Sequence, residues 1–156
     1  MNTYYVGIDP GIKGAVGILD RKGQYAAVHD IPIMKIGEKN KVDAEKLMFI
    51  LVDVPTVDQR IMVERVHAMP NQGVTSVFSF GETYGRICAA VECGGVACTV
   101  DYVVPRVWKK YFQLDNDKNK SLELARSLFP NAELHLKKHS DRAEALLIAR
   151  YLYEKD

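Results

Sequence analysis

The stretch Tyr4-Tyr5-Val6-Gly7-Ile8-Asp9-Pro10-Gly11 is a near-continuous apolar run that ends in a carboxylate and a Pro-Gly turn. An apolar run without polar alternation is typical of a central strand that is covered on both faces. Segments 14–19 and 24–31 follow across short turns and predict the next two strands of a meander. The sequence therefore predicts a sheet that starts with three antiparallel strands.

The rest of the chain alternates between helical and strand patterns. Ala44, Leu47, Met48 and Leu51 have the spacing of one face of an amphipathic helix. Further strands are predicted at 60–66 and 97–104, a charged loop at 35–41, and helices at 74–93, 105–112, 117–129 and 140–153. Two α/β crossovers after a meander indicate an α/β fold with a mixed five-stranded sheet, three strands antiparallel and two parallel, flanked by helices. Because no linker or repeat interrupts this pattern, residues 1–156 are expected to form a single domain.

The composition is ordinary for a globular protein, with 47% hydrophobic and 26% charged residues. No apolar run approaches the length of a membrane span, and no signal-peptide pattern precedes the first strand, so we expect no membrane partner and a cytoplasmic location. The net charge of +1 neither supports nor excludes a nucleic-acid partner, because the distribution of charge matters more than its sum.

Four carboxylates occur where core-forming segments would otherwise continue apolar. Asp9 and Glu64 each end an apolar run, and Asp141 and Glu144 share the core-facing side of the last predicted helix. Acids in a first helical turn are commonly explained by the helix dipole alone, but here two further acids end strands. Buried carboxylates need a compensating partner, and oxygen-only ligands suit Mg²⁺ or Mn²⁺. The four acids therefore predict a metal-dependent phosphoryl-transfer site.

The chemistry of phosphodiester hydrolysis is consistent with such a site. The reaction needs an in-line water and a stabilised leaving oxygen, and two Mg²⁺ ions about 3.5–4 Å apart supply both. Asp9, on the most central predicted strand, is the best candidate to bridge the metals, with Glu64, Asp141 and Glu144 completing their coordination.

Several motifs, in chain order, resemble the RuvC family of Holliday junction resolvases. They are Gly7-Ile8-Asp9-Pro10-Gly11, Val63-Glu64-Arg65-Val66, Phe80-Gly81-Glu82-Thr83-Tyr84-Gly85-Arg86, and His139-Ser140-Asp141-Arg142-Ala143-Glu144-Ala145. The resemblance implies an RNase H-like fold, a homodimer, and two divalent metals per active site held by Asp9, Glu64, Asp141 and Glu144. It also implies symmetric nicks with 5′-phosphate ends in four-way DNA, during recombination and repair. A branch-migration motor is a further partner that the sequence leaves open.

Two positions depart from the family pattern. Glu144 stands where the family more often has Asp, so its longer side chain should reach the metal from a slightly retracted helix. His67 stands where bacterial members often have an aromatic residue. This second difference keeps open a viral or phage-type relative that cuts forks, flaps and other branched DNA as well as four-way junctions.

Basic and amide side chains surround the acids in sequence and are the predicted DNA contacts. Arg106, Lys109 and Lys120 match the basic stretch of the family, and basic clusters beside a metal site favour phosphate contacts. The other candidates are Lys118, His67, Asn71, Gln72, Lys137 and Lys138.

The long predicted helix carries a strip of small residues, Gly81, Gly85 and Cys88. Such a strip permits close approach of another backbone, either the chain's own sheet or the partner in a two-fold dimer. The family resemblance favours the dimer. Trp108, the only tryptophan, is expected to pack in the core.

Other functions remain open at this stage. An RNase H-like nuclease that acts on RNA or RNA–DNA hybrids would use the same acids. An actin-like or sugar-kinase ATPase would need further Gly-rich phosphate loops and a longer chain. A non-catalytic junction-binding module would be expected to lack at least one of the four acids, and all four are present.

Overall fold

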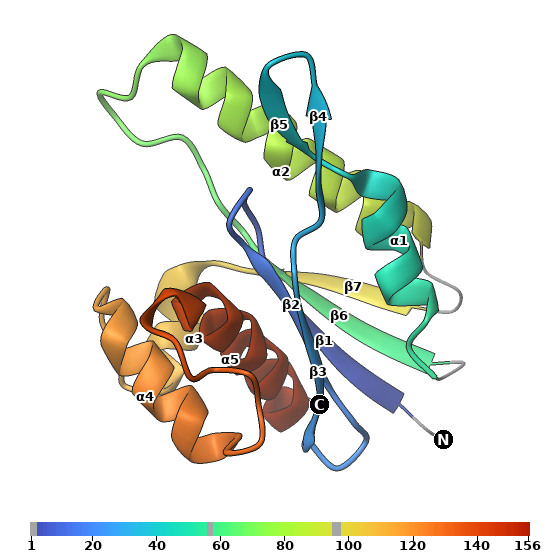
Figure 1. Ribbon diagram of the computed structural model, residues 1–156. Helices are drawn as coiled ribbons and strands as arrows, with labels where there is room; N and C mark the ends of the chain where they lie inside the picture. The colour runs from blue at the N-terminus through green and yellow to red at the C-terminus, as the bar shows by residue number, and fades with distance from the viewer. Residues whose placement is uncertain (1–2, 56–57, 95–97) are drawn as a thin grey trace.

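A five-stranded mixed sheet forms the centre of the computed structural model, which describes residues 3–55, 58–94 and 98–156 (Figure 1). Its strands, in spatial order, are β3 (Tyr25–Asp30), β2 (Ala15–Leu19), β1 (Thr3–Asp9), β6 (Asp58–Glu64) and β7 (Cys98–Val103). Strands β1, β2 and β3 are antiparallel, and β6 and β7 run parallel to β1. The predicted α/β sheet, with its meander and two parallel strands, is confirmed.

Helices cover both faces of the sheet (Figure 1). Helices α1 (Ala44–Val52) and α2 (Val74–Gly94) cover one face, and α3 (Pro105–Tyr111), α4 (Lys118–Leu128) and α5 (Ser140–Lys155) cover the other. Residues of β1 alternate between two cores: Val6 and Ile8 pack with α1 and α2, whereas Tyr5 packs with α5. This alternation points the side chain of Asp9 toward α5.

The prediction of a charged loop at 35–41 is wrong. This segment belongs to a two-stranded hairpin, β4 (Ile33–Ile36) and β5 (Lys39–Val42), whose register pairs Ile36 with Lys39. The turn between them uses Gly37 at a φ of 61°, a conformation that glycine adopts at little cost. Charged residues along both strands hid the alternation that normally marks a strand.

Helix α5 lies directly against β1 and β2. Gly7 and Gly17 face its backbone, so no side chain separates the helix from the two strands at these points. The first turn of α5 is thereby fixed over the end of β1. Among the described residues, no helix combines the length and apolar character needed to cross a membrane.

Candidate active site

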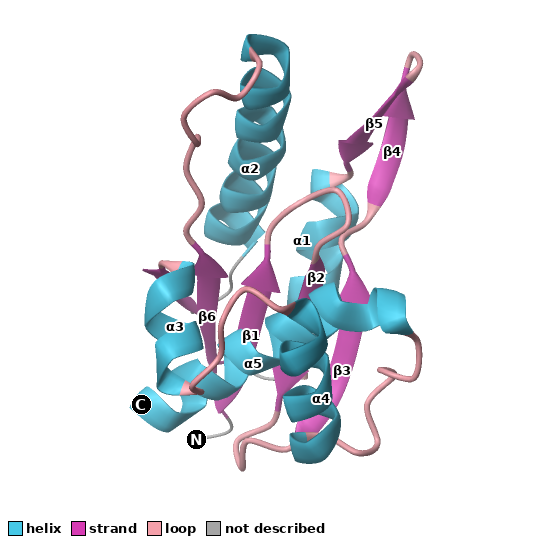
Figure 2. Ribbon diagram, turned by 90° about the vertical axis from the view of Figure 1, so that its left-hand side faces the viewer, coloured by secondary structure: helices cyan, strands magenta, loops and turns pink. Residues whose placement is uncertain are grey.

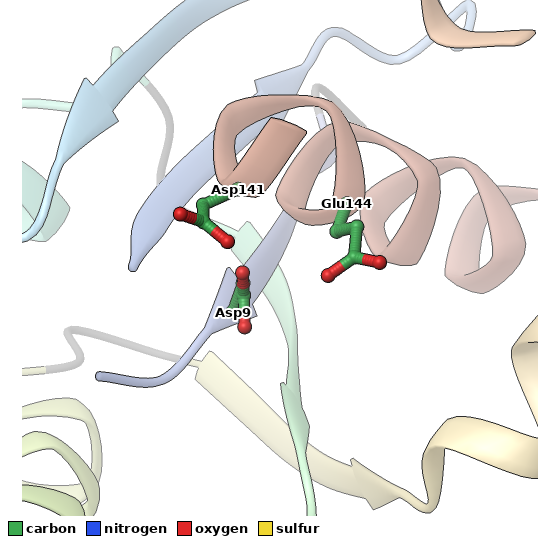
Figure 3. Close-up of side chains that lie close together, drawn as sticks. All are labelled: Asp9, Asp141 and Glu144. Carbon is green, nitrogen blue, oxygen red and sulfur yellow. The ribbon is translucent and has the colours of Figure 1, made fainter. Parts of the chain in front are cut away.

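Three of the four predicted acids, Asp9, Asp141 and Glu144, converge at the end of β1, and the fourth, Glu64, ends the neighbouring strand. Because Ile8 pairs with Val63 across parallel strands, the next residues, Asp9 and Glu64, end neighbouring strands. The first two turns of α5 bring Asp141 and Glu144 over this end of the sheet. Carboxylate oxygens of Asp9, Asp141 and Glu144 lie within 4.8 Å of one another, and the three side chains converge on a shared space (Figure 3).

Burial makes this concentration of negative charge unfavourable without a cation. Asp9, Glu64 and Glu144 are only 8%, 8% and 4% exposed. Burial, followed by the charges of Glu144, Glu64 and Asp141, raises the pKa of Asp9 well above its usual range. Burial also raises the pKa of Glu64. Converging carboxylate oxygens in a poorly hydrated place form a donor set that fits Mg²⁺ or Mn²⁺.

Two lysines, one from α3 and one from α4, lie against these acids. The Nζ of Lys109, from α3, is 3.2 Å from Oε1 of Glu144. The Nζ of Lys118, from the first turn of α4, forms an ion pair with Asp141 and lies 4.0 Å from Oε2 of Glu144. Both lysines were predicted as DNA contacts from their position in the sequence. The structure places them beside the carboxylates, where a phosphate bound to metal ions held by these acids would also lie.

Trp108 has a role at this site that the sequence reading did not anticipate. Its side chain is fully buried, as expected for a core anchor, but its Nε1 also donates a 2.7 Å hydrogen bond to Oε2 of Glu64. This bond opposes the effect of burial on the pKa of Glu64 and fixes the direction of the carboxylate. A buried indole N–H normally donates to an acceptor, so the expected burial of Trp108 could have indicated a hydrogen-bond partner from the sequence.

Replacing Trp108 by phenylalanine should weaken metal binding and cleavage by roughly 10–100-fold, the usual effect of removing a hydrogen bond to a metal ligand. The aromatic ring is kept, so most of the packing is kept. Cleavage measured against Mg²⁺ concentration should show a midpoint at higher Mg²⁺. Tyr111→Phe is the matched control. It removes a hydroxyl of α3 that donates to the exposed carboxylate of Glu154, in α5, instead of to one of the four acids. An unchanged Mg²⁺ midpoint in Trp108→Phe would leave the tryptophan with a packing role only.

The other predicted DNA contacts occupy different positions. His67 and Arg106 line a groove of about 960 Å³ together with Lys109. Lys120 is exposed and pairs with Asp115. The remaining candidates are Asn71, at a φ of 65°, Gln72, whose Oε1 accepts a 2.8 Å bond from the Met69 N–H, and Lys137 and Lys138, both exposed before α5.

The small-residue strip of α2 faces away from the sheet. A Cβ added at Gly81 or Gly85 would meet no atom within 4 Å, and both glycines are exposed. Cys88, one turn beyond Gly85, is half-buried. Close packing of the two glycines against the chain's own sheet is therefore excluded.

Comparisons by sequence found no matching family model and no matching curated protein. Comparison of structures found solved chains of similar fold, among them two RuvC structures. One is described as "T. thermophilus RuvC in complex with Holliday junction substrate"; it matches with a TM-score of 0.65 at 16% identity, over 98% of this chain and 94% of that chain. The other, "Thermus thermophilus RuvC structure", matches with a TM-score of 0.54 at 17% identity, over 99% and 95% of the two chains. The chain thus has the RNase H-like α/β fold of RuvC, as the motifs implied.

Proposed function

We propose that this chain is a member of the RuvC family: a metal-dependent endonuclease, of a single domain, that resolves Holliday junctions. The convergence of Asp9, Asp141 and Glu144 within 4.8 Å carries the proposal, because it builds an acidic metal site on a RuvC-like fold. Glu64, at the end of the neighbouring strand, is the fourth acid. The structural relative that contains a Holliday junction supports four-way DNA as the substrate class.

Asp9, Glu64, Asp141 and Glu144 would hold the divalent metals, two per active site. Bound Mg²⁺ or Mn²⁺ would activate a water and stabilise the leaving oxygen during phosphodiester hydrolysis. Asp9 ends β1 beside Glu64 at the end of β6, and its carboxylate lies within 4.8 Å of those of Asp141 and Glu144, so it would be a ligand shared by both sides of the site. Trp108 holds Glu64 in one orientation, which reduces the reorganisation needed when the substrate arrives.

Lys109 and Lys118 complete the charge balance of the site. Each ammonium neutralises part of the carboxylate cluster in the protein alone. When metal and DNA are bound, the same lysines lie close enough to the acids to bind the oxygens of a phosphate held there. They would therefore orient the DNA strand as well as stabilise the acidic cluster.

A homodimer is the proposed assembly, with α2 as the contact. Exposed Gly81 and Gly85 leave space for a second α2, and the exposed apolar side chains of Val74 and Phe78 lie on the same helix. A two-fold dimer would present two active sites to a junction that is itself roughly two-fold symmetric. Paired nicks of like polarity would follow.

Gly85→Leu should convert the dimer to a monomer. Within one chain the added side chain meets open space, so folding should be unaffected, but two facing helices could no longer approach closely. Sedimentation velocity at several protein concentrations measures the change. Glu45→Leu, which adds the same side chain on the exposed surface of α1, should remain dimeric. A Gly85→Leu protein that sediments as the unmodified dimer would remove α2 from the interface.

Cleavage of end-labelled synthetic DNAs tests the function directly. The panel is a four-way junction, a three-way fork, a flap, a linear duplex and an RNA–DNA hybrid, each with Mg²⁺, Mn²⁺ or EDTA. Metal-dependent, symmetric nicks confined to the four-way junction are the expected result. Comparable cutting of forks and flaps would favour a general debranching nuclease, an alternative that His67 keeps open. A folded protein that binds junctions but cuts nothing would be a junction-binding module.

A further inference from the structure

A second groove lies beside the β4–β5 hairpin. Its volume is about 660 Å³, and it lies between the β1–β2 turn, the hairpin and the first turns of α2. It includes Gly11, which lies two residues beyond Asp9 in the chain. The side chains that line it include Lys13, Lys39, Thr75, Ser76, Ser79 and Phe80. Its charged lining residues are both lysines, and its hydroxyl groups are suitable donors to a polyanion such as the DNA backbone.

This groove shares one lining residue, Phe80, with a neighbouring hollow. Phe80 also lines a small hollow of about 110 Å³, which His67 lines from the other side. His67 in turn lines the larger groove that contains Arg106 and Lys109. Phe80 and His67 therefore each line two of three neighbouring hollows between the hairpin and α3. Gly11, which lines the first hollow, follows Asp9 by two residues, and Lys109, which lines the last, forms an ion pair with Glu144.

The hairpin is held in place at its base. Lys41 of β5 forms an ion pair with Glu82 of α2, and Nη1 of Arg86 donates a 3.2 Å hydrogen bond to the carbonyl oxygen of Val42. Figure 2 shows the hairpin and α2 both projecting beyond the same end of the strands of the sheet. These contacts hold the β4–β5 hairpin, which carries Lys39, against α2.

The two groove lysines have no competing ion pair. Lys13 and Lys39 are exposed, and neither ammonium forms a salt bridge within residues 3–55, 58–94 and 98–156. Glu82, whose pKa is lowered chiefly by its hydrogen bond from Lys41 and in smaller part by the charge of Lys39, already pairs with Lys41 and lies 3.7 Å from Arg86. The positive charges of Lys13 and Lys39 are thus available to a ligand.

We propose that Lys39 and Lys13 bind the phosphate backbone of the junction arm that leaves the active site on the hairpin side. The inference rests on the proposed function and extends it. DNA would be held on both sides of the scissile phosphate, by the hairpin groove on one side and by the α3 groove on the other. Such contacts would position the strand without reading its sequence.

Binding of the full chain to a fluorescent four-way junction in EDTA, across a range of NaCl concentrations, tests this proposal. Each of Lys13→Ala and Lys39→Ala should raise Kd roughly fivefold at about 0.15 M salt, and lower the slope of log Kd against log salt by about 0.9. Hydroxyl-radical footprinting of the double variant should show lost protection along one stretch of arm. Lys22→Ala, an exposed lysine in the turn between β2 and β3 at the opposite edge of the sheet, should change neither quantity.

The outcomes separate this inference from the proposed function. A double variant with the Kd, slope and footprint of Lys22→Ala would overturn the role of the hairpin groove. If Lys109→Ala weakens binding in the same series, the proposed function would stand without the hairpin. An unmodified protein that neither prefers junctions over duplex nor cuts them would instead overturn the function itself. A changed sedimentation coefficient for Lys39→Ala would make the hairpin a contact between copies, which also contradicts the proposal.

Discussion

Asp9→Asn should reduce metal-dependent cleavage of a four-way junction by about 10³-fold or more, while junction binding stays within about threefold of the unmodified protein. The amide keeps the size of the carboxylate but removes the charge that a divalent metal requires. Loss of several kcal/mol of transition-state stabilisation by the metals corresponds to this change in rate. Binding should persist because Asp9 is buried and offers little surface to DNA, and removal of its charge also reduces repulsion of the phosphate.

The same substitution should stabilise the metal-free protein. Burial and the neighbouring acids raise the pKa of Asp9 above its ordinary value of 3.8. A group with a raised folded-state pKa favours the folded state most below its unfolded pKa, and this contribution is lost as the pH rises through the folded value. In EDTA, the unmodified protein should therefore lose stability as the pH rises from about 4 toward neutrality, and Asp9→Asn should lose less. Near neutral pH we expect a Tm higher by roughly 3 °C, or about 1 kcal/mol.

Asp20→Asn is the matched control for both measurements. Asp20 lies in the β2–β3 turn, where its Oδ1 accepts hydrogen bonds from the N–H groups of Lys22 and Gln24. The Oδ1 of asparagine can accept the same bonds, so cleavage and the pH profile should remain unchanged. If Asp9→Asn lost junction binding together with its folded structure, Asp9 would be a structural residue and the proposed metal site would be wrong.

The sheet was predictable because its apolar patterns and turn residues agree. The run that contains Val6 and Ile8 could only be a covered strand, and both residues are fully buried. The β4–β5 hairpin escaped prediction because its strands carry exposed lysines and are stabilised by contacts with distant residues of α2, such as Glu82. A hairpin formed by long-range ion pairs leaves little local pattern in the sequence.

The acids of the site could be predicted from the sequence, but the side chains that contact them could not. A carboxylate at the end of an apolar run is conspicuous, which is why Asp9 and Glu64 stood out. Which side chains would touch these acids depends on how α3 and α4 pack, and sequence spacing does not determine that packing. Trp108 reaches Glu64 across 44 positions of the chain, and Lys118 reaches Asp141 across 23.

The position of α5 depends on two glycines in the sheet. A Cβ built on Gly7 would lie 2.2 Å from the carbonyl oxygen of Ala145 and 2.3 Å from the N of Ala149. A Cβ on Gly17 would lie 2.6 Å from the N of Leu146. These neighbours are backbone atoms of a buried helix, so no side-chain rotation can relieve the contact. Glycine inside a strand often marks such a close backbone approach.

Gly7→Ala should lower the free energy of unfolding by about 3 kcal/mol or more, because the added methyl group must push α5 away from the sheet. Urea denaturation followed by circular dichroism measures the loss. Gly73→Ala is the control for stability, since a Cβ there would meet nothing closer than Oγ of Ser76 at 3.9 Å. Gly17→Ala should behave like Gly7→Ala, because it displaces the same helix.

The displacement should also impair cleavage in any fraction of Gly7→Ala that stays folded. Helix α5 carries Asp141 and Glu144, and a shift of about 1 Å in a catalytic group can reduce the rate by roughly 10²-fold. Cleavage should be measured per folded molecule, with the folded fraction taken from the urea curve. A Gly7→Ala protein with unchanged stability and full activity would show that α5 does not rest on β1 as described. A destabilised protein with full activity per folded molecule would show that the acids can find their positions without this contact, and that the metals rather than the sheet determine where the first turn of α5 lies.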